Sequence, residues 1–92
     1  MMTTQQERRT KLVHLIATIA ETDVASVRGE QRLREDLGMD SLGALELLST
    51  VSEALSIDLD VEDAMDLRTV DDAARFVEKS YLEQHDDSVA RA

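Results

Sequence analysis

The stretch EDLGMDSLGALELL, residues 35–48, decides the fold, because it opens the most apolar helix expected in the chain. Its leucines continue into a stripe of apolar residues spaced by three and four, which predicts a helix from Ser41 to about Ser56. The stripe consists of Ala44, Leu47, Leu48, Val51 and Leu55. A polar residue at such a start is usually an N-cap, and either the Ser41 hydroxyl or the Asp40 carboxylate can accept a hydrogen bond from a first-turn amide.

Three further helices are expected around this one. Apolar residues at helical spacing predict a first helix over residues 5–20, capped by Thr3 or Thr4, and a fourth over residues 71–84. A short third helix fits residues 62–65. No strand-like alternation, internal repeat or proline interrupts the chain. The predicted class is therefore all-α, a small four-helix bundle.

The segment 21–40 between the first two helices has no sustained period. A connection of this length must be packed down by its own side chains. The expected anchors are Val24, Val27, Leu33 and Leu37, with a turn of helix over residues 34–37. We expect one small domain over residues 1–84 and a flexible polar tail over residues 85–92.

The charge balance points to protein partners. The 92 residues include 20 acidic and 10 basic side chains, a net charge of -10, which disfavours binding to nucleic acid and to anionic membranes. Phe76 and Tyr81 are the only aromatic residues, so a platform for stacking bases is missing. No apolar segment approaches the roughly 20 residues that span a bilayer, and we expect a cytoplasmic monomer without membrane insertion.

Catalytic roles for Ser41 fit the sequence poorly. The nucleophile-elbow pattern needs glycine two residues on either side of the serine, whereas Gly38 lies three residues before it and Gly43 two after. The two histidines, His14 and His85, have no evident reason to meet Ser41. The sequence therefore disfavours a hydrolytic role for Ser41.

The acidic cluster DLDVED, residues 58–63, invites comparison with a calcium loop. Such a loop requires glycine at its sixth position and glutamate at its twelfth, where this chain has Asp63 and Thr69. An acidic, solvated surface is the better interpretation, and no metal site is predicted.

One leucine lies on the polar side of the predicted second helix. At 100° per residue, the face opposite Val51 carries Leu42, Glu46, Ser49 and Glu53. Residues 35–67 contain ten acidic side chains and no lysine or arginine. An exposed apolar side chain surrounded by negative charges indicates a docking surface for a basic partner that has a small apolar pocket. We assign Asp40, Leu42, Glu46, Glu53 and Met65 to this surface.

Residues 37–48, LGMDSLGALELL, together with residues 51–77, resemble the acyl carrier proteins, and the likeness extends over roughly residues 12–81. The resemblance implies that Ser41 of the D-S-L motif, flanked by Asp40 and Leu42, is esterified by the phosphate of 4'-phosphopantetheine, whose thiol carries acyl groups. Glu46 and Glu53 match acidic positions of the family's recognition helix. The partial positive charge of a helix N-terminus would favour the attached phosphate.

The resemblance also implies the partners: a phosphopantetheinyl transferase, an acyl-loading ligase or acyltransferase, and a ketosynthase or other acyl-processing enzyme with a basic surface. Gly43 and Ala44 follow the motif where many fatty-acid carriers have an acid, and Asp60 stands where proline is common. These differences favour a specialised fatty-acid, polyketide or related pathway. A D-alanyl or aminoacyl carrier is the alternative, and a small acidic helical adaptor without a prosthetic group is the alternative from another class.

Overall fold

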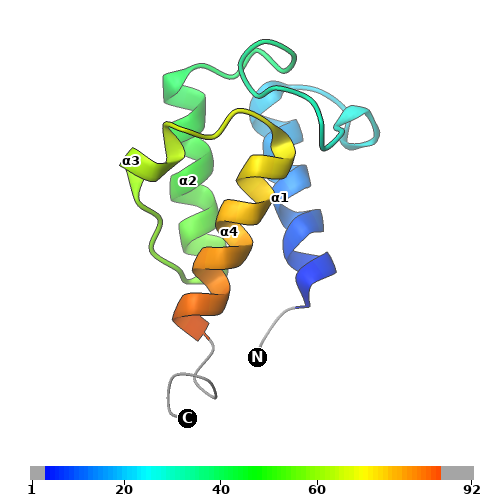
Figure 1. Cartoon of the computed structure of the whole chain (residues 1–92). Coiled ribbons are helices and arrows are strands. Elements are labelled where there is room, and N and C mark those ends of the chain that lie inside the picture. Colours follow the sequence, from blue (N-terminus) through cyan, green and yellow to red (C-terminus); the bar gives the residue numbers. More distant parts are fainter. Residues whose placement is uncertain (1–3, 86–92) are drawn as a thin grey trace.

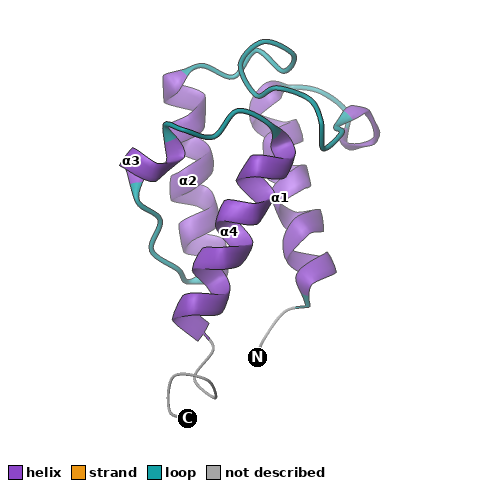
Figure 2. Cartoon of the chain, viewed as in Figure 1, coloured by secondary structure: helices purple, strands orange, loops and turns teal. Residues whose placement is uncertain are grey.

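The computed structural model describes residues 4–85 and is built from helices and loops, with no strand in that part of the chain (Figure 2). Its elements are α1 (Gln5–Ala20), the 3₁₀ turn η1 (Val24–Ser26), α2 (Ser41–Leu55), α3 (Val61–Ala64) and α4 (Val70–His85). In Figure 1, α2 and α4 run in the same direction, α1 runs opposite to both, and α3 lies beside α2. The predicted all-α bundle with a long first loop and a short third helix is confirmed.

Helix α1 begins at a capping box. The Thr4 hydroxyl accepts a hydrogen bond from the Glu7 amide at 3.1 Å, and the Glu7 carboxylate accepts one from the Thr4 amide at 2.8 Å. Two amides that have no partner within the helix are thereby satisfied. The helix ends where Glu21 adopts a left-handed conformation with φ of 56°. Of the two predicted caps, Thr4 is the one used.

The core lies between α1, α2 and α4. Its most completely buried large side chains come from these three helices, and they are Leu12, Ile16, Val51 and Val70. The apolar stripe predicted for α2 faces this core: Leu47, Leu48, Val51 and Leu55 are buried and Ala44 is half-buried. Because an isolated helix of 15 residues is marginal in water, this shared apolar contact is the main source of helix stability.

The long first loop packs onto the core as expected at three of its four predicted anchors. Leu33 is buried, and Val27 and Leu37 are half-buried against the core cluster. The fourth prediction was wrong, because Val24 begins η1 and remains 38% exposed. Residues 34–37 form hydrogen-bonded turns where a turn of helix was expected.

Backbone hydrogen bonds also attach this loop to the segment that leads into α4. The Leu33 amide donates to the Arg68 carbonyl at 2.8 Å, and the Asp71 amide donates to the Gly29 carbonyl at 2.9 Å. These bonds satisfy peptide groups that the loop would otherwise leave exposed or unpaired. The long connection is consequently an ordered part of the fold.

The C-terminal end of α4 extends one residue further than predicted. His85, assigned to the tail from the sequence, belongs to the helix, and its ring stacks on Tyr81 with centroids 4.4 Å apart. Residues 86–92, the rest of the predicted tail, lie outside the described residues. Within residues 4–85, no helix is both long enough and apolar enough to cross a bilayer.

Candidate functional site

The loop before α2 is fixed by a glycine turn and a buried methionine. Gly38 adopts φ of 69°, a left-handed conformation that glycine takes without steric cost. The next amide, that of Met39, donates to the Leu33 carbonyl at 2.8 Å, and the Met39 side chain is only 5% exposed. Helical periodicity does not indicate this anchor, although an apolar residue just before an N-cap commonly packs back onto its helix. Met39 therefore holds the junction against the core from one residue before the cap.

Asp40 is the N-cap of α2, and Ser41 is the first helical residue. The Asp40 carboxylate accepts a hydrogen bond from the Gly43 amide at 2.8 Å, while its carbonyl accepts one from the Ala44 amide at 2.9 Å. Ser41 is exposed, and its hydroxyl makes no hydrogen bond to any described residue. Of the two capping groups considered from the sequence, the carboxylate is the one used, which leaves the serine hydroxyl available for chemistry.

This cap changes the expectation that the first-turn amides as a group would hold a phosphate. The Gly43 amide already donates its hydrogen bond to Asp40. The amides of Ser41 and Leu42 donate to no described residue, so only these two would be available to a phosphate on Ser41. The Asp40 carboxylate would also repel a second anion. The junction fits a phosphodiester on the exposed hydroxyl, held by few contacts and free to project from the surface.

Gly43 allows the first turn of α2 to approach its neighbours closely. A Cβ atom at this position would lie 3.0 Å from Met39 Cγ and 3.3 Å from Ile19 Cγ2. Contacts that short require the neighbouring side chains to move. Glycine in a helix costs roughly 1 kcal/mol relative to alanine, and the close packing of Met39 provides a physical reason for it here. The acid common after this motif would meet the same obstruction.

The predicted exposed stripe on α2 points away from the core. Leu42 is 74% exposed, and Glu46, Ser49 and Glu53 are exposed along the same side. The helical wheel used for the sequence is therefore correctly phased. An exposed leucine directly after Ser41 has no packing role within the described structure.

Further apolar side chains are exposed near this stripe. Met65, which directly follows α3, is 74% exposed, as the assignment to a docking surface requires. Val61 in α3 and Leu45 in α2 are 47% and 45% exposed, and neither was predicted from the sequence to belong to the docking surface. Their exposure depends on how α3 sits beside α2, which the periodicity of either helix alone does not reveal.

The acidic field around Ser41 is almost entirely uncompensated. Of the ten acidic side chains between residues 35 and 67, only Asp36 makes an ion pair with any described residue, and its partner is Arg32. The remaining nine, among them Asp40, Glu46 and Glu53, are exposed. These carboxylates are available to a basic partner without breaking an existing pair.

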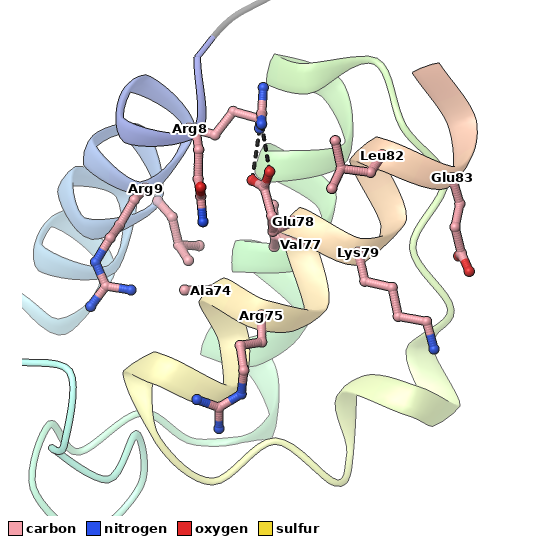
Figure 3. A pocket seen from close by; sticks show the side chains of 11 residues that line it. Arg8, Arg9, Ala74, Arg75, Val77, Glu78, Lys79, Leu82 and Glu83 are labelled. Carbon is pink, nitrogen blue, oxygen red and sulfur yellow. Dashed lines mark hydrogen bonds and ion pairs between the residues drawn. The ribbon is translucent and has the colours of Figure 1, made fainter. Parts of the chain in front are cut away.

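Other candidate chemistry lies elsewhere or is absent from the described residues. His85 contacts the Ser56 carbonyl at 3.0 Å, at the opposite end of α2 from Ser41, and His14 is exposed on α1. No group of three or more His, Asp or Glu side chains within residues 4–85 is arranged to hold a metal ion. A groove of about 420 Å³ between α1 and α4 is shown in Figure 3, and no residue of α2 or α3 lines it.

Comparison with known proteins identifies the class to which this fold and junction belong. A family model described as a phosphopantetheine attachment site matches residues 10–77. An acyl carrier protein of Desulforapulum autotrophicum is 42% identical over 57 residues, covering 62% of this chain and 74% of that protein. An acyl carrier protein of Onion yellows phytoplasma is 34% identical over 70 residues, covering 76% of this chain and 92% of that protein. An acyl carrier protein of Solidesulfovibrio magneticus is 33% identical over 69 residues, covering 75% of this chain and 88% of that protein.

The chain belongs to the acyl carrier protein family. It is accordingly a carrier and not an enzyme, and its prosthetic group is covalently attached 4'-phosphopantetheine. The resemblance noted from the residues around Ser41 is confirmed.

Proposed function

We propose that Ser41 is the attachment residue for 4'-phosphopantetheine and that the chain presents acyl groups to partner enzymes through the surface around it. The observation that carries the proposal is the exposed Ser41 hydroxyl, which has no hydrogen-bond partner among residues 4–85 because Asp40 caps the helix instead. When attached, the group supplies a thiol that carries acyl chains as thioesters.

The residues next to Ser41 have separate roles in this proposal. Asp40 fixes the start of α2 and so holds the Ser41 hydroxyl at a constant place on the surface. Leu42 enters a shallow apolar pocket of the partner, with Met65 as a second apolar contact. Glu46 and Glu53 meet basic side chains of the partner, which steers its approach.

The attachment site is tested by mass spectrometry of the intact protein. Incubation with coenzyme A and a phosphopantetheinyl transferase should add the mass of one phosphopantetheine. Ser41→Ala should abolish this gain, while Ser49→Ala, a matched change at another exposed serine of α2, should retain it. Modification of the Ser41→Ala protein would contradict the assignment, and so would an absence of mass gain in the unaltered protein.

The partners we propose are this transferase, an acyl-loading ligase or acyltransferase, and a ketosynthase or other acyl-processing enzyme. We propose a specialised fatty-acid, polyketide or related pathway, with loading by a ligase favoured over malonyl transfer. Gly43 supports this, because it stands where many fatty-acid carriers have an acid, and a Cβ atom there would require the Met39 and Ile19 side chains to shift. A D-alanyl or aminoacyl carrier is the second candidate, favoured by the same glycine.

The loading reaction separates these candidates. The holo protein should be a poor substrate for a standard malonyl transferase, and rapid, complete malonylation would contradict the proposed pathway. Loading by an aminoacyl ligase in preference to an acyl ligase would favour the second candidate. A cytoplasmic location and a monomeric state, inferred from the sequence, remain predictions.

A further inference from the structure

Helix α3 is held mainly from its two ends. It is a single turn, Val61–Ala64, and none of its four residues is buried. A helix this short is not stable alone in water, and helices of this kind normally depend on a buried face. The flanking residues do reach the core: Ile57 is 3% exposed, and Leu59 and Leu67 are partly buried against the core cluster. The position of α3 is therefore set largely by the segments on either side.

The segment after α3 is held by the long first loop. The Arg68 carbonyl accepts the hydrogen bond from the Leu33 amide, and Arg32 and Thr69 form an isolated antiparallel bridge. These are backbone contacts, which do not depend on the identity of a polar side chain.

In the segment before α3, the side chain of Gln84 pairs with the backbone of Asp58, which lies between the buried Ile57 and the partly buried Leu59. The Gln84 side-chain carbonyl oxygen accepts a hydrogen bond from the Asp58 amide at 2.7 Å, and its NH₂ group donates to the Asp58 carbonyl at 2.8 Å. The amide of Gln84 thus pairs with both backbone groups of Asp58, as an opposing strand residue would. Asp60, which caps α3 through the Glu62 amide at 2.9 Å, lies only two residues further along the chain.

The end of α4 that carries Gln84 is held in place by contacts of its own. The His85 ring stacks on Tyr81, lies 3.0 Å from the Ser56 carbonyl through Nε2, and so contacts the same loop. The Arg8 guanidinium also lies over the Tyr81 ring, 4.0 Å from the ring centroid. These contacts fix the end of α4, and so fix the position from which the Gln84 side chain reaches Asp58.

We propose that Gln84 is a positioning residue: its paired hydrogen bonds to Asp58 set the place of α3, and with it the exposed side chains of Val61 and Met65, relative to Ser41. The inference rests on the proposed function where it concerns docking. Its structural part, the restraint of α3 by Gln84, is independent of any carrier role.

Hydrogen exchange of the full chain tests the structural part. In Gln84→Ala, exchange of the Ala64 and Met65 amides, which bond to the carbonyls of Asp60 and Val61, should accelerate by roughly fivefold to tenfold, as expected for the loss of two exposed hydrogen bonds. Alanine favours helix at least as strongly as glutamine, so fraying of α4 would not account for the change. Gln84→Glu keeps the acceptor but loses the donor, and should give an intermediate acceleration.

Glu83→Ala is the matched control, because the Glu83 side chain is exposed on the same helical turn and makes no hydrogen bond or ion pair with a described residue. It should leave exchange in α3 unchanged. Equal exchange in Gln84→Ala and Glu83→Ala would overturn the inference, whatever the carrier assay shows.

Transfer kinetics with a phosphopantetheinyl transferase test the positioning part. Gln84→Ala should raise KM severalfold with little change in kcat, because α3 helps to form the docking surface and not the reacting group. If Gln84 acts through α3, Gln84→Ala should have little further effect on KM when Met65 is already alanine. Additive effects of the two changes would overturn the positioning role, even if the exchange result holds. Absence of modification in the unaltered chain would instead contradict the proposed function and leave the exchange test in force.

Discussion

Arg8 of α1 and Glu78 of α4 form a bidentate ion pair that joins the first and last helices. Arg8 Nε donates to Glu78 Oε1 at 2.8 Å and Nη2 donates to Oε2 at 2.5 Å (Figure 3), and the two side chains are only 6% and 18% exposed. The hydrogen bonds to Glu78 raise the pKa of Arg8 above its ordinary value. The guanidinium also lies over Tyr81, so it connects the helices by charge and by stacking.

Removing Arg8 should destabilise the fold strongly. Arg8→Ala leaves the largely buried Glu78 carboxylate without this partner, and we expect a loss of about 2–4 kcal/mol in the free energy of unfolding. Arg9→Ala is the control: its pair with Asp71 is 46% and 42% exposed, and its loss should be below about 1 kcal/mol. Urea unfolding of both variants measures the difference. Similar losses in the two would show that the Arg8 pair has no special role.

Asp72 should contribute to stability in a pH-dependent way. Its carboxylate accepts hydrogen bonds from the Thr69 and Arg68 amides and pairs with Arg75, and these contacts, the Thr69 bond first, lower the pKa of Asp72. A carboxyl whose pKa is lower in the folded state stabilises the fold above its unfolded pKa of about 3.9, and this stabilisation is lost as pH falls through the folded value. Asp72→Asn should therefore differ most from the unaltered chain above about pH 4.

Urea midpoints measured from pH 7 down to pH 3 follow this difference, which should shrink as the pH approaches 3. Glu83→Gln removes one negative charge from an exposed side chain without a hydrogen bond or ion pair to a described residue, and at pH 7 it should change the urea midpoint much less than Asp72→Asn does. A difference between Asp72→Asn and the unaltered chain that stays constant over this range would contradict the assignment.

The start of α2 should distinguish capping from modification. Asp40→Ala removes the carboxylate that accepts from the Gly43 amide and should cost about 1 kcal/mol of stability. Ser41→Ala should change stability by less than about 0.5 kcal/mol, since the hydroxyl is exposed and makes no hydrogen bond with a described residue. Thermal melts compare the two. If Ser41→Ala is as destabilising as Asp40→Ala, the hydroxyl is part of the cap.

Sequence periodicity predicted the helices well because each long helix carries its own apolar stripe. Two of the missed core residues, Met39 and Ile57, are single apolar residues in segments without a helical repeat, so periodicity could not indicate their burial. Val24 failed for the converse reason, since an apolar residue in a loop gains burial only if the chain folds inward there.

The same distinction applies to the candidate site: features set by neighbouring residues could be predicted from the sequence, and contacts between distant residues could not. Ser41, Asp40 and Leu42 could be found from local sequence, because capping and helical phase are properties of neighbouring residues. The contact between Gln84 and Asp58 joins residues 26 positions apart, and no local pattern reports it. The exposure of Val61 and Leu45 likewise depends on packing between helices.

The exposed stripe of α2 should act in docking and not in folding. Leu42→Ala should leave the melting temperature nearly unchanged, because Leu42 is 74% exposed, whereas Val51→Ala removes methyl groups from a side chain that is 2% exposed and should cost about 2 kcal/mol.

Glu46→Lys reverses an exposed charge, so it should slow association with a basic transferase at low salt and lose this effect as salt screens the charges. The Leu42→Ala defect, on the order of 1–2 kcal/mol of binding free energy, should persist at high salt because it reflects apolar contact. Rates of phosphopantetheine transfer at low and high salt, with thermal melts of each variant, measure both effects. Normal transfer by Leu42→Ala would remove Leu42 from the docking surface, and a salt-independent Glu46→Lys defect would contradict electrostatic steering.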